Sequence, residues 1–341
     1  MTRSRNIPRD AMGASAIEAS GLAKSYGDKV VLDGIDLDIP RGAVFSLLGP
    51  NGAGKTTTVQ ILSTLIAADA GQARVAGHDL VADPDAVRRA IGVTGQYAAV
   101  DALLTAEENM LMMADLLHLP RSEGRRRAAE LLDRFGLADA AKQLPGTFSG
   151  GMRRKLDLAM TLVGDPSVIF LDEPTTGLDP RSRRTMWDSV RELVANGTTI
   201  FLTTQYLEEA DQLADRVAVL DGGRIVAQGT PDELKRRIPG GHIRLAFADA
   251  ASMDATADRL ALDTVVRDAE ALTLQIPSDG SIPALRSVLD VLEAAGVPAE
   301  HLTVHTPDLD DVFLTLTGGA ATGSATRSLS ATTNSPKESA R

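Results

Sequence analysis

The fold of this chain is decided by one glycine-rich stretch, Gly49-Pro50-Asn51-Gly52-Ala53-Gly54-Lys55-Thr56. The stretch matches the pattern G-x-x-x-x-G-K-[ST], follows a short apolar run at 43–48 and precedes a helix-like segment that begins near Lys55. Glycines let the backbone wrap closely around phosphate groups, so that several N–H groups and the positive end of the helix face the anion. The stretch therefore predicts a strand, a phosphate-binding loop and a helix of an α/β domain.

The end of this loop carries the polar side chains that we expect to bind a nucleotide. Lys55 would pair with the β and γ phosphates of ATP, and the Thr56 hydroxyl would reach Mg²⁺. We also expect the neighbouring Thr57 to bind the nucleotide. A glycine-rich turn without a ligand is the alternative, but a full match between a strand and a helix favours phosphate binding. We therefore expect the chain to bind and hydrolyse ATP with Mg²⁺.

A second apolar run ends in two carboxylates. The run at 168–171 is followed directly by Asp172 and Glu173, and a parallel sheet can bring this end beside the phosphate loop. Asp172 suits coordination of Mg²⁺, directly or through water, and Glu173 could polarise an attacking water as a general base. An acidic pair that only caps a strand end is the alternative. The phosphate loop elsewhere in the chain favours catalysis.

A third motif lies between these two. Ser149-Gly150-Gly151 opens a helix-like stretch that runs from Met152 to Leu162. Serine and glycines at the start of a helix can form a second anion site. The triplet alone is a common turn, so its position just before the strand of Asp172 is what makes it informative.

The chain of 341 residues is long enough for one large and one small domain. Short apolar runs alternate with amphipathic stretches over 15–240, which predicts a parallel sheet covered by helices, with central strands at 43–48, 167–171 and 199–203. Thr105 and Glu108, like Thr230 and Glu233, have the spacing of helix capping boxes. The ends, 1–14 and 319–341, lack apolar periodicity, and we expect them to be disordered.

The segment 241–318 is expected to form a small α+β domain. Its pattern predicts strands at 243–247, 264–267, 271–276 and 301–306, and helices at 252–260, 282–295 and 309–316. The succession βαββαβ that precedes the last helix fits a ferredoxin-like sandwich. The segment contains no phosphate loop and no ligand cluster, so its residues do not indicate its role.

Composition excludes several classes of protein. The net charge of −11 argues against general nucleic-acid binding, which depends on clustered positive charge. The absence of cysteine excludes disulfides and thiolate metal sites. No apolar run reaches the roughly 18 to 20 residues that span a bilayer, and the first residues lack the apolar core of a signal peptide. These features predict a cytosolic chain.

Taken together, the motifs resemble those of ATP-binding-cassette (ABC) ATPases over almost all of residues 16–240. Within that family the chain is most similar to the ATP-binding subunits of daunorubicin/doxorubicin-resistance exporters. Four segments carry this second likeness: GVTGQYAAVDALLTAEEN (92–109), FSGGMRRKLDLA (148–159), LTTQYLEEADQLAD (202–215) and DDVFLTLTG (310–318). The resemblance implies a P-loop domain with a mixed sheet core and a helical subdomain.

The resemblance also implies roles for single residues. Tyr26 would stack on adenine, although a partly buried tyrosine at a strand end is the alternative. Gln96 would contact the Mg²⁺ or attacking-water region and link it to a membrane partner. Ser149 and Gly151 would bind the γ-phosphate held by a second subunit, and Asp179 would lie on the loop that joins the two sites. In the family two cassettes sandwich two ATP molecules head to tail, which implies a homodimer for a chain with one cassette.

Two departures from the family pattern stand out. Phe148 and Met152 replace the usual leucine and glutamine around the signature glycines, which predicts altered affinity or coupling. Gln205 replaces the histidine that in most members touches the γ-phosphate. Because glutamine can donate a hydrogen bond but carries no charge, we expect slow hydrolysis. The exporter subfamily tends to have glutamine at this position.

These implications lead to one preferred function and two alternatives. The preferred function is a peripheral ATPase at the cytoplasmic face of the membrane, which drives a separate permease to export a hydrophobic drug, antibiotic or lipid-like compound. The region that starts at Thr105 would face the permease, although an ordinary capped surface helix is equally consistent. A soluble factor acting on nucleic acid or ribosomes is one alternative, and a slow-turnover ATP sensor, suggested by Gln205, is the other.

Overall fold

The structure is a computed structural model that describes residues 15–96, 98–238, 241–260, 265–296 and 299–316. The two ends expected to be disordered, 1–14 and 319–341, lie outside the described residues. Among the helices of the described part, none combines the length and hydropathy that crossing a membrane requires.

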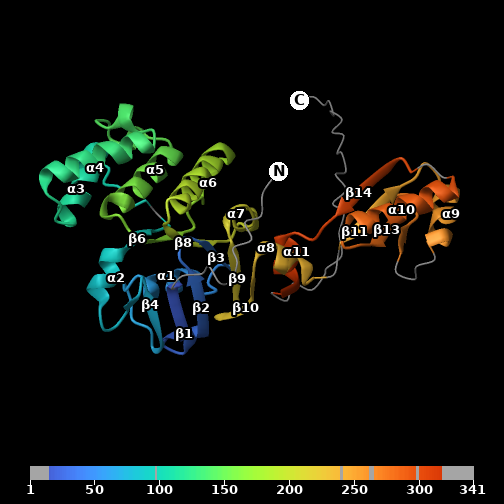
Figure 1. The fold of residues 1–341 in the computed structure, drawn as a ribbon, viewed down its shortest axis with the longest axis horizontal. Coiled ribbons are helices and arrows are strands. Elements are labelled where there is room, and N and C mark those ends of the chain that lie inside the picture. The colour runs from blue at the N-terminus through green and yellow to red at the C-terminus, as the bar shows by residue number, and fades with distance from the viewer. Residues whose placement is uncertain (1–14, 97, 239–240, 261–264, 297–298, 317–341) are drawn as a thin grey trace, which may run out of the picture.

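A six-stranded sheet forms the centre of the larger unit, in the order β10-β9-β3-β8-β7-β6 (Figure 1). Its strands are β3 (Val44–Leu48), β6 (Ile91–Thr94), β7 (Val168–Asp172), β8 (Thr199–Thr204), β9 (Arg216–Asp221) and β10 (Arg224–Gly229). Neighbouring strands are parallel except β9 and β10, whose hairpin turn has Gly222 at φ 54° and Gly223 at φ 79°. The predicted central strands and the mixed sheet are therefore confirmed.

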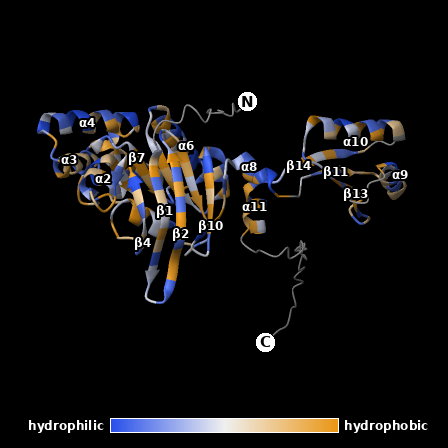
Figure 2. Ribbon diagram, turned by 60° about the horizontal axis from the view of Figure 1, so that its bottom comes forward, coloured by the Kyte–Doolittle hydropathy of each residue, from blue (hydrophilic) through white to orange (hydrophobic). Residues whose placement is uncertain are grey.

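A second sheet, which the sequence reading did not separate from the first, is antiparallel with the order β2-β1-β4-β5. It consists of β1 (Ser15–Tyr26), β2 (Lys29–Pro40), β4 (Ala70–Val75) and β5 (His78–Asp79). Polar and apolar residues alternate along β1 and β2, as Figure 2 shows, because one face is solvated. The other face packs with α1 (Lys55–Leu62) and with the phenylalanine rings of β3, β7 and β8, which lie 5.4 to 5.5 Å apart.

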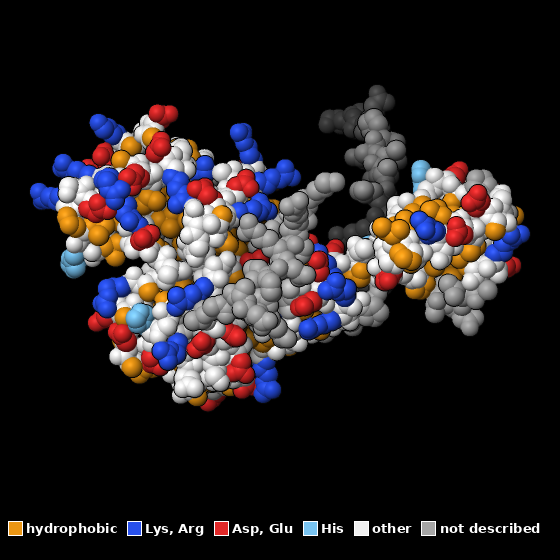
Figure 3. All heavy atoms as spheres, viewed as in Figure 1, with side chains coloured by type: hydrophobic (Ala, Val, Ile, Leu, Met, Phe, Trp, Pro, Cys, Tyr) orange, Lys and Arg blue, Asp and Glu red, His pale blue; other side chains and the backbone are white. Residues whose placement is uncertain are grey.

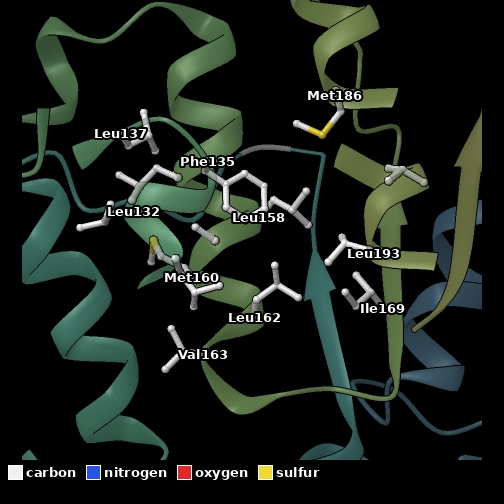
Figure 4. Close-up of a cluster of buried hydrophobic side chains, with 14 of the residues drawn as sticks. Leu132, Phe135, Leu137, Leu158, Met160, Leu162, Val163, Ile169, Met186 and Leu193 are labelled. Carbon is white, nitrogen blue, oxygen red and sulfur yellow. The ribbon is translucent and has the colours of Figure 1, made fainter. Parts of the chain in front are cut away.

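The opposite face of the six-stranded sheet is covered by a group of helices. These are α3 (Ala106–Leu116), α4 (Arg121–Arg134), α5 (Gly150–Thr161) and α6 (Pro180–Ala195), while α2 (Pro84–Ala90) lies beside β6. Leu158, Met160 and Leu193 of this group meet Ile169 of β7 in one buried cluster (Figure 4). Because β7 is buried on both faces, its run is apolar throughout and does not alternate.

Both predicted capping boxes are confirmed. The Thr105 hydroxyl accepts from the Glu108 N–H at the start of α3, and the Glu108 carboxylate accepts from the Thr105 N–H. Thr230 and Glu233 exchange the same bonds at α8 (Pro231–Arg236), which follows α7 (Leu207–Leu213) and the β9–β10 hairpin. These caps satisfy N–H groups that a helix start leaves without partners.

The C-terminal unit has the predicted βαββαβ order. It contains β11 (His242–Ala246), α9 (Ala250–Leu260), β12 (Val266–Asp268), β13 (Thr273–Pro277), α10 (Ile282–Ala295) and β14 (His301–His305). The strands form an antiparallel sheet in the order β12-β13-β11-β14, and α9 and α10 pack on the face that carries Ile243, Leu245 and Leu274. This order is that of the expected ferredoxin-like sandwich.

The last helix, α11 (Leu309–Leu316), lies apart from this sandwich. Its buried side chains, Leu309 and Val312, pack with Ala210 of α7 and Leu234 of α8 in the larger unit. The chain thus leaves the larger unit after α8, forms the sandwich and returns (Figure 1). The sequence predicted the helix at 309–316 but not the surface against which it packs.

Candidate nucleotide-binding and catalytic site

The glycine-rich loop joins β3 to α1, as predicted, and its backbone requires glycine. Gly52 has φ 83° and Gly54 has φ 112°, a region that side chains disfavour. A Cβ on Gly49 would lie 2.4 Å from the Leu220 carbonyl oxygen, and one on Gly54 would lie 2.6 Å from the Leu32 side chain. Within the described residues no side chain caps α1, so the N–H groups of its first turn face the loop without a side-chain acceptor.

Lys55 extends into the loop that precedes it. Its ammonium donates to the carbonyl oxygens of Gly49 at 2.8 Å and Pro50 at 3.2 Å, and it lies 3.6 Å from Glu173 Oε1. The side chain is only 5% exposed. A buried cation beside a helix start with free N–H groups is a site that favours phosphate groups.

The acidic pair at the end of β7 lies beside this loop. The Thr56 hydroxyl donates to Asp172 Oδ2 at 2.9 Å, and the Thr203 hydroxyl of β8 donates to Asp172 Oδ1. Glu173 has φ 49° and turns its side chain toward Lys55, while the Thr176 hydroxyl donates to its Oε2 at 3.2 Å. The parallel sheet thus brings Thr56, Asp172 and Glu173 together, although their roles remain predictions.

The donor set fits Mg²⁺ that is shared with phosphate groups. Thr56 and Asp172 offer a hydroxyl and a carboxylate, the oxygen ligands that Mg²⁺ prefers. No three His, Asp or Glu side chains of the described part are grouped closely enough to hold an ion alone. The pair formed by Thr56 and Asp172 suits Mg²⁺, because this ion is commonly held by one or two carboxylates together with substrate phosphates.

The signature serine and Asp179 lie together at the starts of α5 and α6. Ser149 caps α5 by accepting from the Met152 N–H at 3.2 Å. Asp179 caps α6 by accepting from the N–H and hydroxyl of Ser182, and these bonds hold the pKa of Asp179 below its ordinary value. A Cβ on Gly151 would lie 2.6 Å from the Ser182 hydroxyl. In the described structure no hydrogen bond or ion pair joins 149–151 to the Gly49–Thr56 loop.

Three other predicted site residues, Gln96, Gln205 and Tyr26, are exposed, whereas Thr57 is half-buried. Gln96 lies in the bend after β6, and Gln205 follows β8, beside the end that carries Thr203. Tyr26 ends β1 with 51% of its surface exposed, and the Lys24 ammonium lies 5.7 Å from the centre of its ring. These positions leave all three side chains accessible to a ligand or a second chain, and their roles stay predictions.

Glu209 is a buried acid that none of the sequence motifs identified. It lies in the first turn of α7 and is fully buried, and its Oε1 accepts from the Trp187 indole N–H at 3.1 Å. Burial raises the pKa of Glu209, and the hydrogen bond from the Trp187 indole opposes that rise. Glu209 thus joins α6 to the segment that carries Gln205.

Arg154 is a second buried charged residue with contacts that the sequence reading missed. Its guanidinium donates to the carbonyl oxygens of Gly95 at 2.7 Å and Pro174 at 2.9 Å, and it contacts Asp157 at 3.2 Å. The signal in the sequence is the pair of opposite charges at 154 and 157, although Arg154 also stands between two other basic residues, Arg153 and Lys155. On a helix this spacing is also common at the surface, which is why it was not distinctive.

Comparison with known proteins agrees with this geometry. Residues 32–176 match the model of the family described as ABC transporter. The chain is 50% identical over 307 residues to a daunorubicin resistance ATP-binding protein, DrrA3, of Streptomyces coeruleorubidus, covering 90% of this chain and 97% of the relative. It is 37% identical over 314 residues to the Nod factor export ATP-binding protein I of Ralstonia nicotianae, covering 91% and 97%. A solved structure of an ATP-binding subunit of an ABC transporter is 30% identical with a TM-score of 0.59, covering 65% of this chain and 93% of that one.

Proposed function

This chain belongs to the ABC transporter family of ATP-binding proteins, and from that premise we propose that it is the ATP-hydrolysing subunit of an exporter. As a member of this family it is an ATPase. The observation that carries the proposal is the meeting of Lys55, Thr56, Asp172 and Glu173 at one edge of the sheet. By likeness to the daunorubicin resistance proteins, the proposed cargo is a hydrophobic drug, antibiotic or lipid-like compound.

Each residue at this edge has one part in hydrolysis. The N–H groups of the first turn of α1 and the Lys55 ammonium bind the β and γ phosphates of ATP. Thr56 and Asp172, with Gln96, would hold Mg²⁺, which neutralises phosphate charge when bound. Glu173 accepts the proton of the attacking water as general base, and its position against Lys55 and Thr176 holds the carboxylate toward the phosphates.

The proposed active unit is a homodimer with two composite sites. Ser149 and Gly151 lie at the start of α5, where N–H groups can bind an anion, and Asp179 starts α6 beside them. In the described structure no hydrogen bond or ion pair joins 149–151 to the Gly49–Thr56 loop of the same chain. A second copy placed head to tail would bring Ser149 and Gly151 to the γ-phosphate and Asp179 to the loop that joins the two sites. This arrangement completes each site with residues of both chains.

Ser149→Asp tests the composite site. Aspartate caps a helix as well as serine does, so α5 should keep its start and the melting temperature should stay close to that of the wild type. The added charge would oppose the γ-phosphate bound by the other chain. We expect the KM for ATP to rise by at least about tenfold, because like charges brought together cost several kcal/mol. Steady-state ATPase kinetics measure the change.

Ser281→Asp is the matched control, because Ser281 caps α10 with the same bond in the C-terminal unit. It should leave ATPase kinetics unchanged. Mixing Ser149→Asp protein with Lys55→Ala protein rebuilds one intact composite site in each mixed dimer. Activity above the sum of the two separate proteins supports head-to-tail pairing, and the absence of any such gain argues against it.

The proposed membrane partner is a separate permease, which would place the chain at the cytoplasmic face of the membrane. A groove of about 620 Å³ runs along α3 and is lined by apolar residues, among them Leu111, Met112 and Leu116, and by acidic Glu108 and Asp115. Such a groove suits a short helix of a permease with apolar and basic residues.

On the face drawn in Figure 3, basic and acidic side chains are interspersed, which disfavours the alternative of a nucleic-acid factor.

Loss of the gene tests the proposed export. Cells that lack the chain should accumulate at least one of a panel of hydrophobic drugs, daunorubicin included, and the wild-type gene should restore efflux. A gene carrying Lys55→Ala should fail to restore it. Unchanged efflux of every drug in the panel would count against drug export while leaving the ATPase activity untouched.

A further inference from the structure

Arg154 occupies a buried point where three functional segments meet. The residue lies on α5, five positions after the signature serine, and it is 6% exposed. Its Nη1 donates at 2.7 Å to the carbonyl oxygen of Gly95, the residue before Gln96. Its Nε donates at 2.9 Å to the carbonyl oxygen of Pro174, the residue after Glu173, and its Nη2 lies 3.4 Å from the Asp172 carbonyl oxygen. One guanidinium therefore holds the backbone on both sides of the site.

Asp157, one turn further along α5, completes this arrangement. Its Oδ2 accepts from Arg154 at 3.2 Å, and its Oδ1 accepts from the N–H of Ala99 at 3.0 Å. The pair thus binds the chain on both sides of Gln96 (the Gln96 segment), at the Gly95 carbonyl and at the Ala99 amide. Both side chains are almost completely buried.

Stability alone does not account for such a pair. Burial lowers the pKa of Arg154 and raises that of Asp157, because both charged forms lose water, and their mutual attraction offsets this only in part. Apolar residues of similar volume often replace a buried ion pair with no loss of stability. What apolar side chains lack is the set of donors that fixes the Gly95 and Pro174 carbonyls.

We propose that Arg154 is a positioning residue for hydrolysis, which fixes the Gln96 segment and the Asp172-Glu173-Pro174 turn relative to each other. The guanidinium is planar and carries five donors, so it can hold both backbones in one geometry. A shift of the Gln96 segment is then transmitted to the catalytic acid through a single side chain. The inference rests on the proposed roles of Gln96 and Glu173.

The test compares the double variant Arg154→Met/Asp157→Asn with the wild type. Removing Arg154 alone would leave Asp157 charged and buried, so the single variant could fail to fold. The double variant carries no charge at either position, and the introduced asparagine can still accept from the Ala99 amide. We expect ATP to bind with a Kd within about threefold of the wild type, while kcat falls at least about tenfold, because small displacements of catalytic groups have large effects on rate.

All proteins are assayed at one common temperature that lies well below the lowest of their melting temperatures, so that unfolded protein does not contribute. A low kcat with retained ATP binding supports the positioning role, whereas a wild-type kcat overturns it. Arg125→Met is the matched control, because Arg125 is an exposed arginine of α4. Wild-type and control protein that hydrolyse ATP in the same assay separate failure of this inference from failure of the proposed function.

Discussion

Glu173→Gln should leave ATP bound and lower its hydrolysis at least about 100-fold, the usual contribution of a general base. Glutamine keeps the shape of the side chain and can still accept from the Thr176 hydroxyl, but it cannot take a proton from water. The change also removes the negative charge 3.6 Å from the Lys55 ammonium, which favours an anionic ligand there. Single-turnover hydrolysis and the binding of a fluorescent ATP analogue measure the two effects separately.

If the chain forms head-to-tail dimers, this variant should accumulate as an ATP-bound dimer, because hydrolysis no longer reopens it. Size-exclusion chromatography with and without ATP follows this change. Glu18→Gln is the matched control, since Glu18 is exposed on β1 in the antiparallel sheet, and it should hydrolyse ATP at the wild-type rate. An unchanged rate in Glu173→Gln would show that another group acts as the base.

Gly54→Ala should abolish nucleotide binding. The new Cβ would lie 2.6 Å from Leu32 Cδ2 and 2.8 Å from the Val31 carbonyl oxygen, at a φ of 112°. Strain and overpacking should lower the free energy of unfolding by about 1 to 3 kcal/mol, and relief of the strain would move the N–H groups that face the phosphates. Thermal unfolding with and without ATP measures both effects, because a bound ligand raises the melting temperature.

Gly146→Ala is the control for this substitution. A Cβ on Gly146 has no neighbour within 4 Å, and the residue does not have a positive φ. The control should keep the rise in melting temperature that ATP gives to the wild type. If Gly54→Ala kept it as well, the loop would tolerate a side chain, and its glycine would not be needed for binding.

Most of the fold could be predicted because local and global signals agree. Strands β3, β7 and β8 are short, mostly apolar and buried along their whole lengths because the sheet is covered on both faces, and a glycine-rich loop after β3 fixes where α1 begins. The antiparallel sheet formed by β1, β2, β4 and β5 was not predicted as a separate sheet: β1 pairs with β2 and β4 with β5 as neighbours in the chain, but the pairing of β1 with β4 joins segments far apart. The sandwich of the C-terminal unit was predicted from order alone, without any functional motif.

The candidate site was predictable to the extent that its residues belong to motifs. Thr56 and Asp172 could be expected to meet, because the carboxyl ends of parallel strands lie at one edge. Arg154 and Glu209 could not be identified in this way. A charged residue on an amphipathic helix is usually solvated, and only the packed structure shows that these two face the interior. Their partners are backbone carbonyls and an indole from distant segments.

The return of α11 to the larger unit bears on how deletions of this protein should be designed. A chain cut before β11 loses the sandwich and also α11. The loss of α11 exposes the apolar side chains of Ala210 and Leu234. Any aggregation or loss of assembly would then have two sources. Excising β11 to β14 and splicing α8 to α11 through a short linker keeps this apolar surface covered. Such an internal excision isolates the sandwich, whereas a simple truncation confounds it with the helix.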